Sequence, residues 1–313
     1  MEVLTSVDAE RLSELATRDE FFWLDLAKPA PADLDVVGEL LGLHPLALED
    51  TKEFGQRPKV DVYEDSVLVV FYTAATRSAG FETLEVHLHL SGGYILTVRH
   101  DECLALNDLH EELRAVDEHP EDEIVYRVLD VLTDAYYPVI DAAEERVDAL
   151  EAEILTRRPR RAQLEATYRL RQDVHAMQRR VLAQRDQLLG GEQAILHLPG
   201  LTRGSRMYLR DVVDHLAQIG GELTRQNDDL QALTGTYFNA SATRLTELAT
   251  RLTLITVAFL VWTLVTSFFG QNFAWLVRSV DTQRDFLVWG VGGLVVPTAL
   301  IGALFWIKRH DWF

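Results

Sequence analysis

Residues 252–269 read LTLITVAFLVWTLVTSFF, and residues 286–307 read FLVWGVGGLVVPTALIGALFWI. Neither run contains a charged side chain, and each is long enough to cross a bilayer core, which takes about 20 residues at about 1.5 Å each. Aromatic residues such as Trp262, Trp289 and Trp306 lie in both runs, as is typical of membrane helices with rings near the interfaces. Buried helices of a soluble domain are the alternative, but neither run has the polar face of a surface helix. The sequence therefore predicts two membrane spans.

Charged residues beside the two runs predict their orientation. Basic side chains flank the outer ends of the pair: Arg244, Arg251, Lys308, Arg309 and His310. The loop between the runs instead balances two arginines against two aspartates. Because short cytoplasmic segments retain Lys and Arg during insertion, both termini are expected in the cytoplasm, with the protein in the cell membrane. Residues 1–13 are polar and lack the apolar stretch of a signal peptide.

The chain is strongly acidic, and neither apolar run contributes to its charge. Asp and Glu number 49 against 30 Lys and Arg, a formal net charge of -19. Such an excess repels nucleic acid and anionic headgroups and attracts cations, so we expect no nucleic-acid partner. Cys103 is the single cysteine, so no intrachain disulfide can form, which suits a reducing compartment.

The first 115 residues predict a small α/β domain. A helix is expected at residues 33–41, after two prolines, and strands are expected at four apolar or alternating runs. These strands are residues 60–63, 67–72, 84–90 and 94–98, separated by Gly- and Ser-containing turns.

Residues 116–198 predict two long antiparallel helices, because apolar residues recur at helical spacing. We expect breaks at Pro159 and at Gly190-Gly191, and a kink or local adjustment at Pro138. Residues 199–251 predict a stalk helix that continues into the first span. A helix from residue 201 to residue 269 would be about 100 Å long. A break in this helix at Gly220-Gly221 or Gly235 remains an alternative, since glycine lowers the stability of a helix interior by roughly 1 kcal/mol.

Polar side chains in and before the first span share one helical face. They follow one another at steps of seven, three, four, three and four residues, with a leucine filling the gap: Thr246, Thr253, Thr256, Leu260, Thr263 and Ser267. The alternative role for each hydroxyl is a bond to its own backbone or close helix packing. Because they lie along one stripe, these residues predict the lining of a water-filled pathway. A two-span chain cannot enclose such a lining alone, so this interpretation requires several identical copies.

Just beyond the first span stands Phe269-Gly270-Gln271-Asn272-Phe273. This segment resembles the Gly-Met-Asn signature, preceded by Tyr or Phe, of the CorA superfamily of divalent-cation channels and transporters. The resemblance extends over nearly the whole chain in order, through four further segments: WLDL at residues 23–26, LHPLALED at residues 43–50, QRPKVDVY at residues 56–63 and YILTVRH at residues 94–100. The segment YLRDVVDH at residues 208–215 is similar to the start of the family's stalk helix.

The resemblance implies a fold and a transport function. It implies an α+β cytoplasmic domain, long stalk helices and two C-terminal transmembrane helices, assembled as a homopentameric funnel with the first spans lining the pore. Gly270 and Asn272 would hold the outer mouth, where the Asn amide meets hydrated Mg2+. Gln271 departs from the usual Met, Thr246 from a frequent pore Asn and Leu260 from a frequent pore Met.

The resemblance also implies cytoplasmic gating by Mg2+, with Asp211 in the position of a regulatory acid. The alternative is that Asp211 is an ordinary solvated acid or a partner of Arg210 or His215. Gly235 stands where some relatives carry an acid facing the pore, so an inner acidic ring is expected to be missing.

These expectations assign domains and a function. The segments are 1–115 (α/β domain), 116–198 (funnel helices), 199–251 (stalk), 252–269 (first span), 270–285 (external loop), 286–307 (second span) and 308–313 (basic tail). The hypothesis is a Mg2+ channel or transporter, not an enzyme, that also admits Co2+ or Ni2+ and needs no organic cofactor. The alternatives are a zinc transporter of the ZntB-like branch, coupled to protons, and a non-conducting metal sensor or tether.

Other candidate chemistry is weaker. His87 and His89 lie two apart on a predicted surface strand and can share a metal ion, although surface strands carry such pairs by chance. Cys103, near His100 and Asp101, has the residue type of a nucleophile but no third partner in the sequence. No phosphate-binding loop of the Walker or Rossmann type is present.

Overall fold

A computed structural model describes the protein at residues 2–18, 20–77, 80–114, 121–156, 159–199, 205–271, 274, 278 and 281–312. The chain divides into two compact units, Met1–Gly235 and Thr236–Phe313. The long helix α8, Ser205–Phe269, contributes residues to both units.

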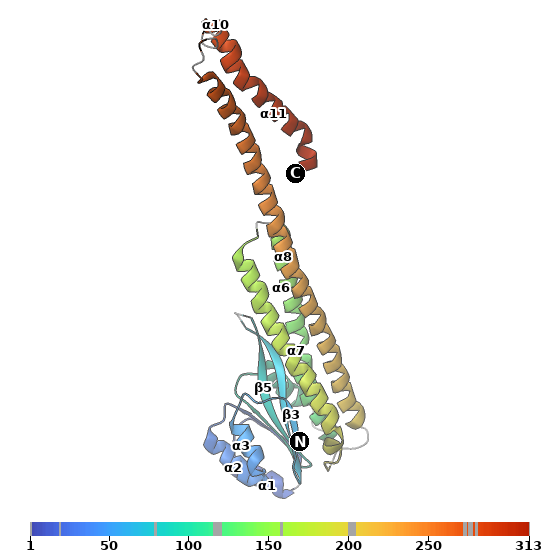
Figure 1. Ribbon diagram of the computed structural model, residues 1–313. Helices are drawn as coiled ribbons and strands as arrows, with labels where there is room; N and C mark the ends of the chain where they lie inside the picture. Colours follow the sequence, from blue (N-terminus) through green and yellow to red (C-terminus); the bar gives the residue numbers. More distant parts are fainter. Residues whose placement is uncertain are drawn as a thin grey trace. The chain divides into compact units, whose positions relative to one another are not determined.

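The first unit contains a six-stranded mixed sheet in the order β1-β2-β6-β5-β4-β3. Figure 1 labels β3 and β5 of this sheet. The strands are β1 Glu2–Leu4, β2 Phe22–Ala27, β3 Lys59–Val62, β4 Ser66–Arg77, β5 Gly80–Ser91 and β6 Tyr94–Arg99. β1, β2 and β6 run parallel, whereas β6, β5, β4 and β3 pair antiparallel. The four predicted strands are confirmed, with β4 and β5 longer than expected.

Two strands were missed by the sequence analysis. β2 has five consecutive buried residues, including the charged Asp25. A parallel strand covered on both faces lacks the alternation that marks a half-exposed strand. β1 has only three residues, too few for a periodic signal.

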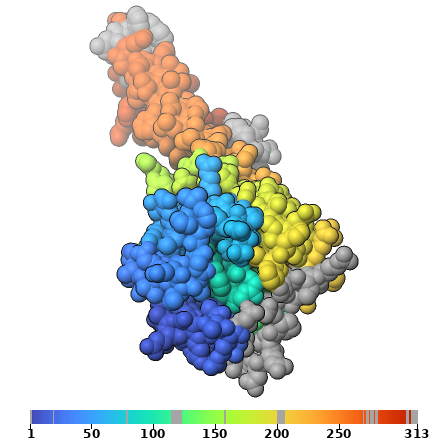
Figure 2. Space-filling view, turned by 90° about the horizontal axis from the view of Figure 1, so that it is seen from below, coloured from blue at the N-terminus to red at the C-terminus, as the bar shows by residue number. Residues whose placement is uncertain are grey.

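Helices cover both faces of this sheet. The first three are α1 Ala9–Arg18, α2 Pro31–Leu41 and α3 Pro45–Lys52. α1 and α2 bury Leu12, Leu15, Leu34 and Val37 in one core cluster with β2 and β6. α7, Arg161–Leu196, instead packs along β3, β4 and β5. Figure 2 shows the surface of the N-terminal helices in blue and that of α7 in yellow.

The remaining helices of the first unit confirm one predicted irregularity and contradict another. α4 is Leu104–Arg114, α5 is Glu121–Asp134 and α6 is Tyr137–Thr156. The local adjustment expected at Pro138 is confirmed as a break between α5 and α6 at residues 135–136. Pro138 is the second residue of α6, where its missing N–H has no helical partner to lose. Gly190-Gly191 does not end α7, which continues to Leu196. A Cβ at Gly191 would lie 2.4 Å from Val60 Cγ1, so the glycine allows α7 to approach β3 closely.

Helix α8 runs without interruption past Gly220, Gly221 and Gly235 to Phe269. In the second unit, α10 Gln283–Asp285, the π-helix η1 Phe286–Val291 and α11 Gly292–Trp312 follow one another without a gap. Thr282 caps this segment by accepting a hydrogen bond from the Asp285 N–H at 3.2 Å. Two helical stretches, Arg206–Phe268 and Gln283–Ala303, are long and apolar enough to cross a membrane, as judged by length and composition.

Candidate functional site: the striped helix and an acidic cluster

The predicted stripe lies on exposed positions of α8: Thr246, Thr253, Thr256, Leu260, Thr263 and Ser267. The hydroxyls of Thr246, Thr253, Thr256 and Thr263 each donate to the carbonyl four residues earlier, at 3.1, 2.9, 2.8 and 2.8 Å. This is the backbone role raised as the alternative above. It uses each hydroxyl's one hydrogen, and the oxygen lone pairs still accept hydrogen bonds. The same residues can therefore satisfy their helix and present acceptor oxygens to the waters around a cation.

The second span contacts a different face of α8. Trp262 Nε1 donates to Thr298 Oγ1 of α11 at 2.6 Å. At 3.6 residues per turn, Trp262 lies about 140° around the helix from the middle of the stripe. The half-buried residues of this segment, which include Leu254, Ala258 and Val261, also lie away from the stripe. Contact with the second span thus leaves the stripe free for water or for another copy of the chain.

The signature segment begins where α8 ends. The Gly270 N–H donates to the Thr266 carbonyl at 2.9 Å, and the Gln271 N–H donates to the Phe268 carbonyl at 3.3 Å. A Cβ at Gly270 would lie 3.1 Å from the Thr266 carbonyl oxygen, which favours glycine at this position. Gln271 is exposed. Asn272, the predicted ion-contacting residue, lies outside the described residues.

A cluster of acidic residues and one histidine forms between α5 and α8 in the first unit. Asp130 and Asp134 are four residues apart on α5, and Asp211 and His215 are four apart on α8, so each pair shares a helix face. His215 Nδ1 lies 3.7 Å from Oδ1 of both Asp130 and Asp134, and His215 Nε2 lies 3.9 Å from Asp211 Oδ1. One ligand atom each from Asp130, Asp134 and His215 lies within 4.8 Å of the others, as suits a metal ion.

The electrostatics of this cluster favour an added cation. Burial and the neighbouring Asp134 carboxylate raise the pKa of Asp130. Asp130 Oδ1 and His215 Nδ1 are buried without a hydrogen-bond partner. Asp211 Oδ2 accepts a hydrogen bond from Tyr126 at 3.0 Å, and the Tyr126 ring stacks on Tyr208. A cation would relieve the repulsion between the carboxylates and use their free oxygens.

Of these residues, only Asp211, which lies beside the Asp130/Asp134/His215 cluster, was predicted as a site residue from the sequence. Asp130 and Asp134 were missed because they are distant from His215 in the chain. The available signal was the repeated spacing of four between polar residues on two helices, which is common on solvated helix faces.

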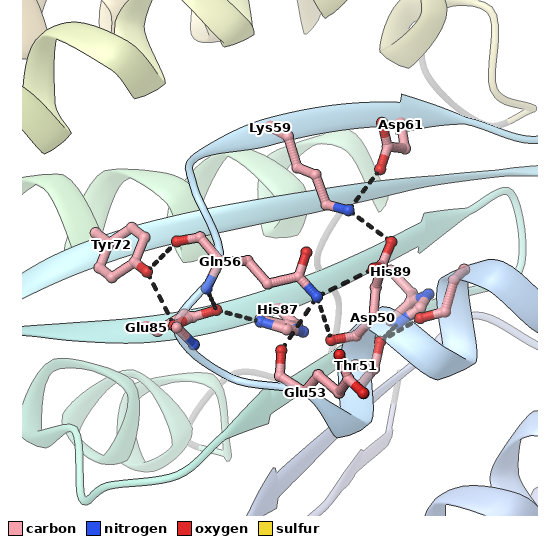
Figure 3. A network of polar contacts seen from close by, with 12 residues as sticks. Asp50, Thr51, Glu53, Gln56, Lys59, Asp61, Tyr72, Glu85, His87 and His89 are labelled. Atoms are coloured by element: carbon pink, nitrogen blue, oxygen red, sulfur yellow. Dashed lines mark hydrogen bonds and ion pairs between the residues drawn. The ribbon is translucent and has the colours of Figure 1, made fainter.

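The His87/His89 pair is not on a surface strand, and that expectation is wrong. Both side chains are buried in β5 (Figure 3). His87 Nε2 lies 2.7 Å from Glu85 Oε1, and His89 Nε2 lies 2.7 Å from Thr51 Oγ1. Within the described ranges, only the Asp130/Asp134/His215 group has the close approach of ligand atoms that a metal ion needs. Cys103 is also buried, and burial raises the pKa of its thiol, the opposite of an activated nucleophile.

The network around Glu85 has a structural role. Its carboxylate accepts hydrogen bonds from the N–H groups of Gly55 and Gln56, at 2.6 and 3.1 Å, and from the Tyr72 hydroxyl at 2.9 Å. Lys59 pairs nearby with Asp50 at 2.5 Å. These contacts, drawn in Figure 3, fasten the connection between α3 and β3 to the sheet.

Comparisons with known proteins agree over most of the chain. A family model described as CorA-like Mg2+ transporter protein matches residues 18–309. The putative metal ion transporter YfjQ of Bacillus subtilis is 26% identical over 302 residues, covering 94% of this chain and 90% of that protein. The cobalt/magnesium transport protein CorA of Thermotoga maritima is 26% identical over 246 residues, covering 77% and 69%.

Solved structures extend the likeness to the fold. The CorA magnesium transporter of Methanocaldococcus jannaschii has a TM-score of 0.79 at 20% identity, covering 93% of this chain and 91% of that one. The cytoplasmic domain of ZntB from Vibrio parahaemolyticus has a TM-score of 0.56 at 9% identity, covering 69% and 86%. The predicted fold, an α+β domain followed by long helices and two apolar C-terminal helices, is confirmed.

Proposed function

The chain belongs to the CorA-like Mg2+ transporter family, a family of ion transporters and not of enzymes, and from this premise we propose how it carries Mg2+ across the cell membrane. Copies of the chain surround an axis with the α8 stripe turned inward. The observation that supports this arrangement is the Trp262–Thr298 contact on the face of α8 away from the stripe. The stripe then supplies rings of neutral oxygens around the pathway, and the bulky Leu260 side chains form its constriction.

Five copies, with both termini in the cytoplasm, are the assembly we propose. One chain offers one striped helix, which cannot enclose water by itself, so a closed ring of identical copies is needed. The number five and the orientation rest on the family resemblance and on the basic flanks of the spans. Lipid then surrounds the second spans.

Gly270, Gln271 and Asn272 form the outer mouth in this proposal. Mg2+ loses its bound water reluctantly, so amide oxygens that contact the water shell can select the ion at low cost. The membrane potential drives entry, since each elementary charge gains about 2.3 kcal/mol per 100 mV and a divalent ion gains twice that. Co2+ and Ni2+ have similar hydration shells and are further candidates for passage.

The Asp130/Asp134/His215 cluster, with Asp211 beside it, is the regulatory cation site that we propose. Its ligand atoms lie within 4.8 Å of one another, and His215 belongs to α8, the helix that also contains the first span. Bound Mg2+ would hold α5 and α8 together and keep the pathway closed. When cytoplasmic Mg2+ falls, repulsion between the carboxylates would loosen this contact.

Zinc transport coupled to protons is the second candidate. His215 favours it, because imidazole is a better ligand for Zn2+ than for Mg2+. The signature also has Gln271 where Met is usual. A non-conducting sensor would keep the cluster but carry no flux.

Metal flux into liposomes that contain the purified protein tests these functions. We expect saturable Mg2+ entry that Asn272→Ala lowers at least tenfold, because the mouth loses its amide. Gln172→Ala, which removes an exposed amide from α7, is the matched control and should leave entry unchanged. Equal flux in Asn272→Ala and the unmodified protein would reject the assigned mouth. Preferential Zn2+ entry that rises on external acidification would favour the second candidate, and absence of all flux would favour the sensor.

A further inference from the structure

The two spans meet at a cleft that contains a hydrogen-bonded pair. The cleft has a volume of about 510 Å³ and is lined by Trp262, Thr266, Leu294, Val295, Thr298 and Ala299. The Trp262 indole donates across it to Thr298 Oγ1 at 2.6 Å. Thr298 Oγ1 in turn donates to the Leu294 carbonyl of its own helix, also at 2.6 Å. The hydroxyl thus uses its hydrogen within α11 and a lone pair for the indole, which aligns both partners.

A second hydroxyl in the same cleft behaves differently. Thr266 Oγ1 donates to the Trp262 and Thr263 carbonyls of its own helix, at 2.8 and 3.1 Å. The Thr266 hydroxyl therefore forms its hydrogen bonds within α8, whereas the Trp262 indole bonds to the other span. Hydrocarbon offers the indole N–H no replacement acceptor, so the bond to Thr298 is favoured there over an unpaired donor.

We propose that the Trp262–Thr298 hydrogen bond is a positioning contact that fixes the rotation of the striped helix about its own axis, an inference that rests on the proposed function. Trp262 stands between Leu260 and Thr263 in sequence. Any roll of α8 at Trp262 is therefore transmitted directly to these two stripe residues. A roll of about 20°, at an outer helix radius of about 5–6 Å, moves a side chain by about 2 Å. A shift of that size approaches the width of a water molecule and changes how a hydrated ion passes Leu260.

Side-chain replacements isolate the bond. Thr298→Val keeps the shape and deletes the acceptor, and Trp262→Phe keeps an aromatic ring and deletes the donor. Thr266→Val is the matched control, because it removes a hydroxyl of the same cleft that bonds within α8. Thr298→Ser restores the acceptor. The oligomeric state of each variant is measured by size-exclusion chromatography with light scattering, so that disassembly is distinguished from mispositioning.

The readout is Mg2+ flux as a function of external Mg2+ concentration. We expect Thr298→Val and Trp262→Phe each to change the maximal flux three- to tenfold, while the concentration for half-maximal flux stays unchanged, since the mouth is untouched. The double variant should be no more altered than the stronger single one, because both delete the same bond. Thr266→Val and Thr298→Ser should stay within twofold of the unmodified protein.

Three results would overturn the inference. They are normal maximal flux in Thr298→Val, additive effects in the double variant, or an equal effect of Thr266→Val. Each presupposes flux in the unmodified protein. If the unmodified protein carries no ion at all, the proposed function fails instead, and the positioning role fails with it.

Discussion

At the residue scale, burial decides what each polar side chain can do. The sequence presents His87 and His89 as a possible metal-binding pair, but their neighbours in space are Glu85 and Thr51. Burial lowers the pKa of His89 to about 3, so His89 stays neutral in the folded protein. The spacing of the two histidines does not distinguish buried histidines from metal ligands, because burial and the contact of His89 with Thr51 of α3 depend on the tertiary structure.

His89 predicts an acid-dependent loss of stability. Its folded pKa of about 3 lies below the ordinary value of 6.5, so below pH 6.5 the unfolded chain binds a proton that the folded chain excludes. The free energy of unfolding is therefore unaffected by His89 above pH 6.5. As the pH falls from 6.5 toward 3, it decreases by up to about 1.4 kcal/mol per pH unit. His89→Gln can still contact Thr51 but does not titrate, so its stability should fall less steeply. Thermal unfolding of both proteins between pH 7 and pH 5 measures this, and parallel curves would contradict it.

At the element scale, the effect of a glycine in a helix depends on what packs against it. Gly190 and Gly191 predict the end of a helix, yet α7 continues through both. Gly191 faces Val60 of β3, whereas a Cβ at Gly190 would meet nothing within 4 Å. Glycine is therefore required only where α7 touches the sheet, a requirement that depends on packing and not on local propensity.

Alanine substitution at these two glycines should have effects of opposite sign. Gly191→Ala places a methyl group 2.4 Å from Val60 Cγ1, and such overpacking costs typically about 1–3 kcal/mol. Gly190→Ala gains helix propensity without a clash and should stabilise by up to about 1 kcal/mol. Denaturant unfolding followed by circular dichroism compares the two variants. Equal shifts for the neighbouring positions would show that α7 does not approach β3 as described.

Elements with strong periodicity were predictable, and tertiary relations between them were not. The apolar spans, the stripe and strands β3 to β6 follow from composition and spacing alone. β2 was missed because it is buried on both faces and therefore has no alternation. The cluster of Asp130, Asp134 and His215 needs α5 and α8 to lie together, and neither helix's sequence specifies the other as its partner.

At the scale of the whole molecule, one uninterrupted helix, α8, carries both His215 of the proposed regulatory site and the stripe. Under the proposed function, a cation bound at the cluster acts on the spans through this shared helix. We therefore expect Asp134→Asn to weaken Mg2+ binding at the cluster and to leave the mouth intact. Entry should then be inhibited less by Mg2+ inside the liposomes, with at least a fivefold higher concentration needed for half inhibition.

A binding measurement without flux separates this prediction from conduction itself. A cation that binds only the folded protein raises the free energy of unfolding by about 2.7 kcal/mol when its free concentration is about 100 times the dissociation constant. Mg2+ should accordingly raise the unfolding temperature of the unmodified protein, and the rise should shrink in Asp134→Asn. Asp228→Asn is the matched control, since Asp228 is an exposed α8 acid outside the cluster, and it should keep the full rise. If Asp134→Asn and Asp228→Asn respond to Mg2+ alike, the acidic cluster is a solvated surface, and any gating must act through the spans alone.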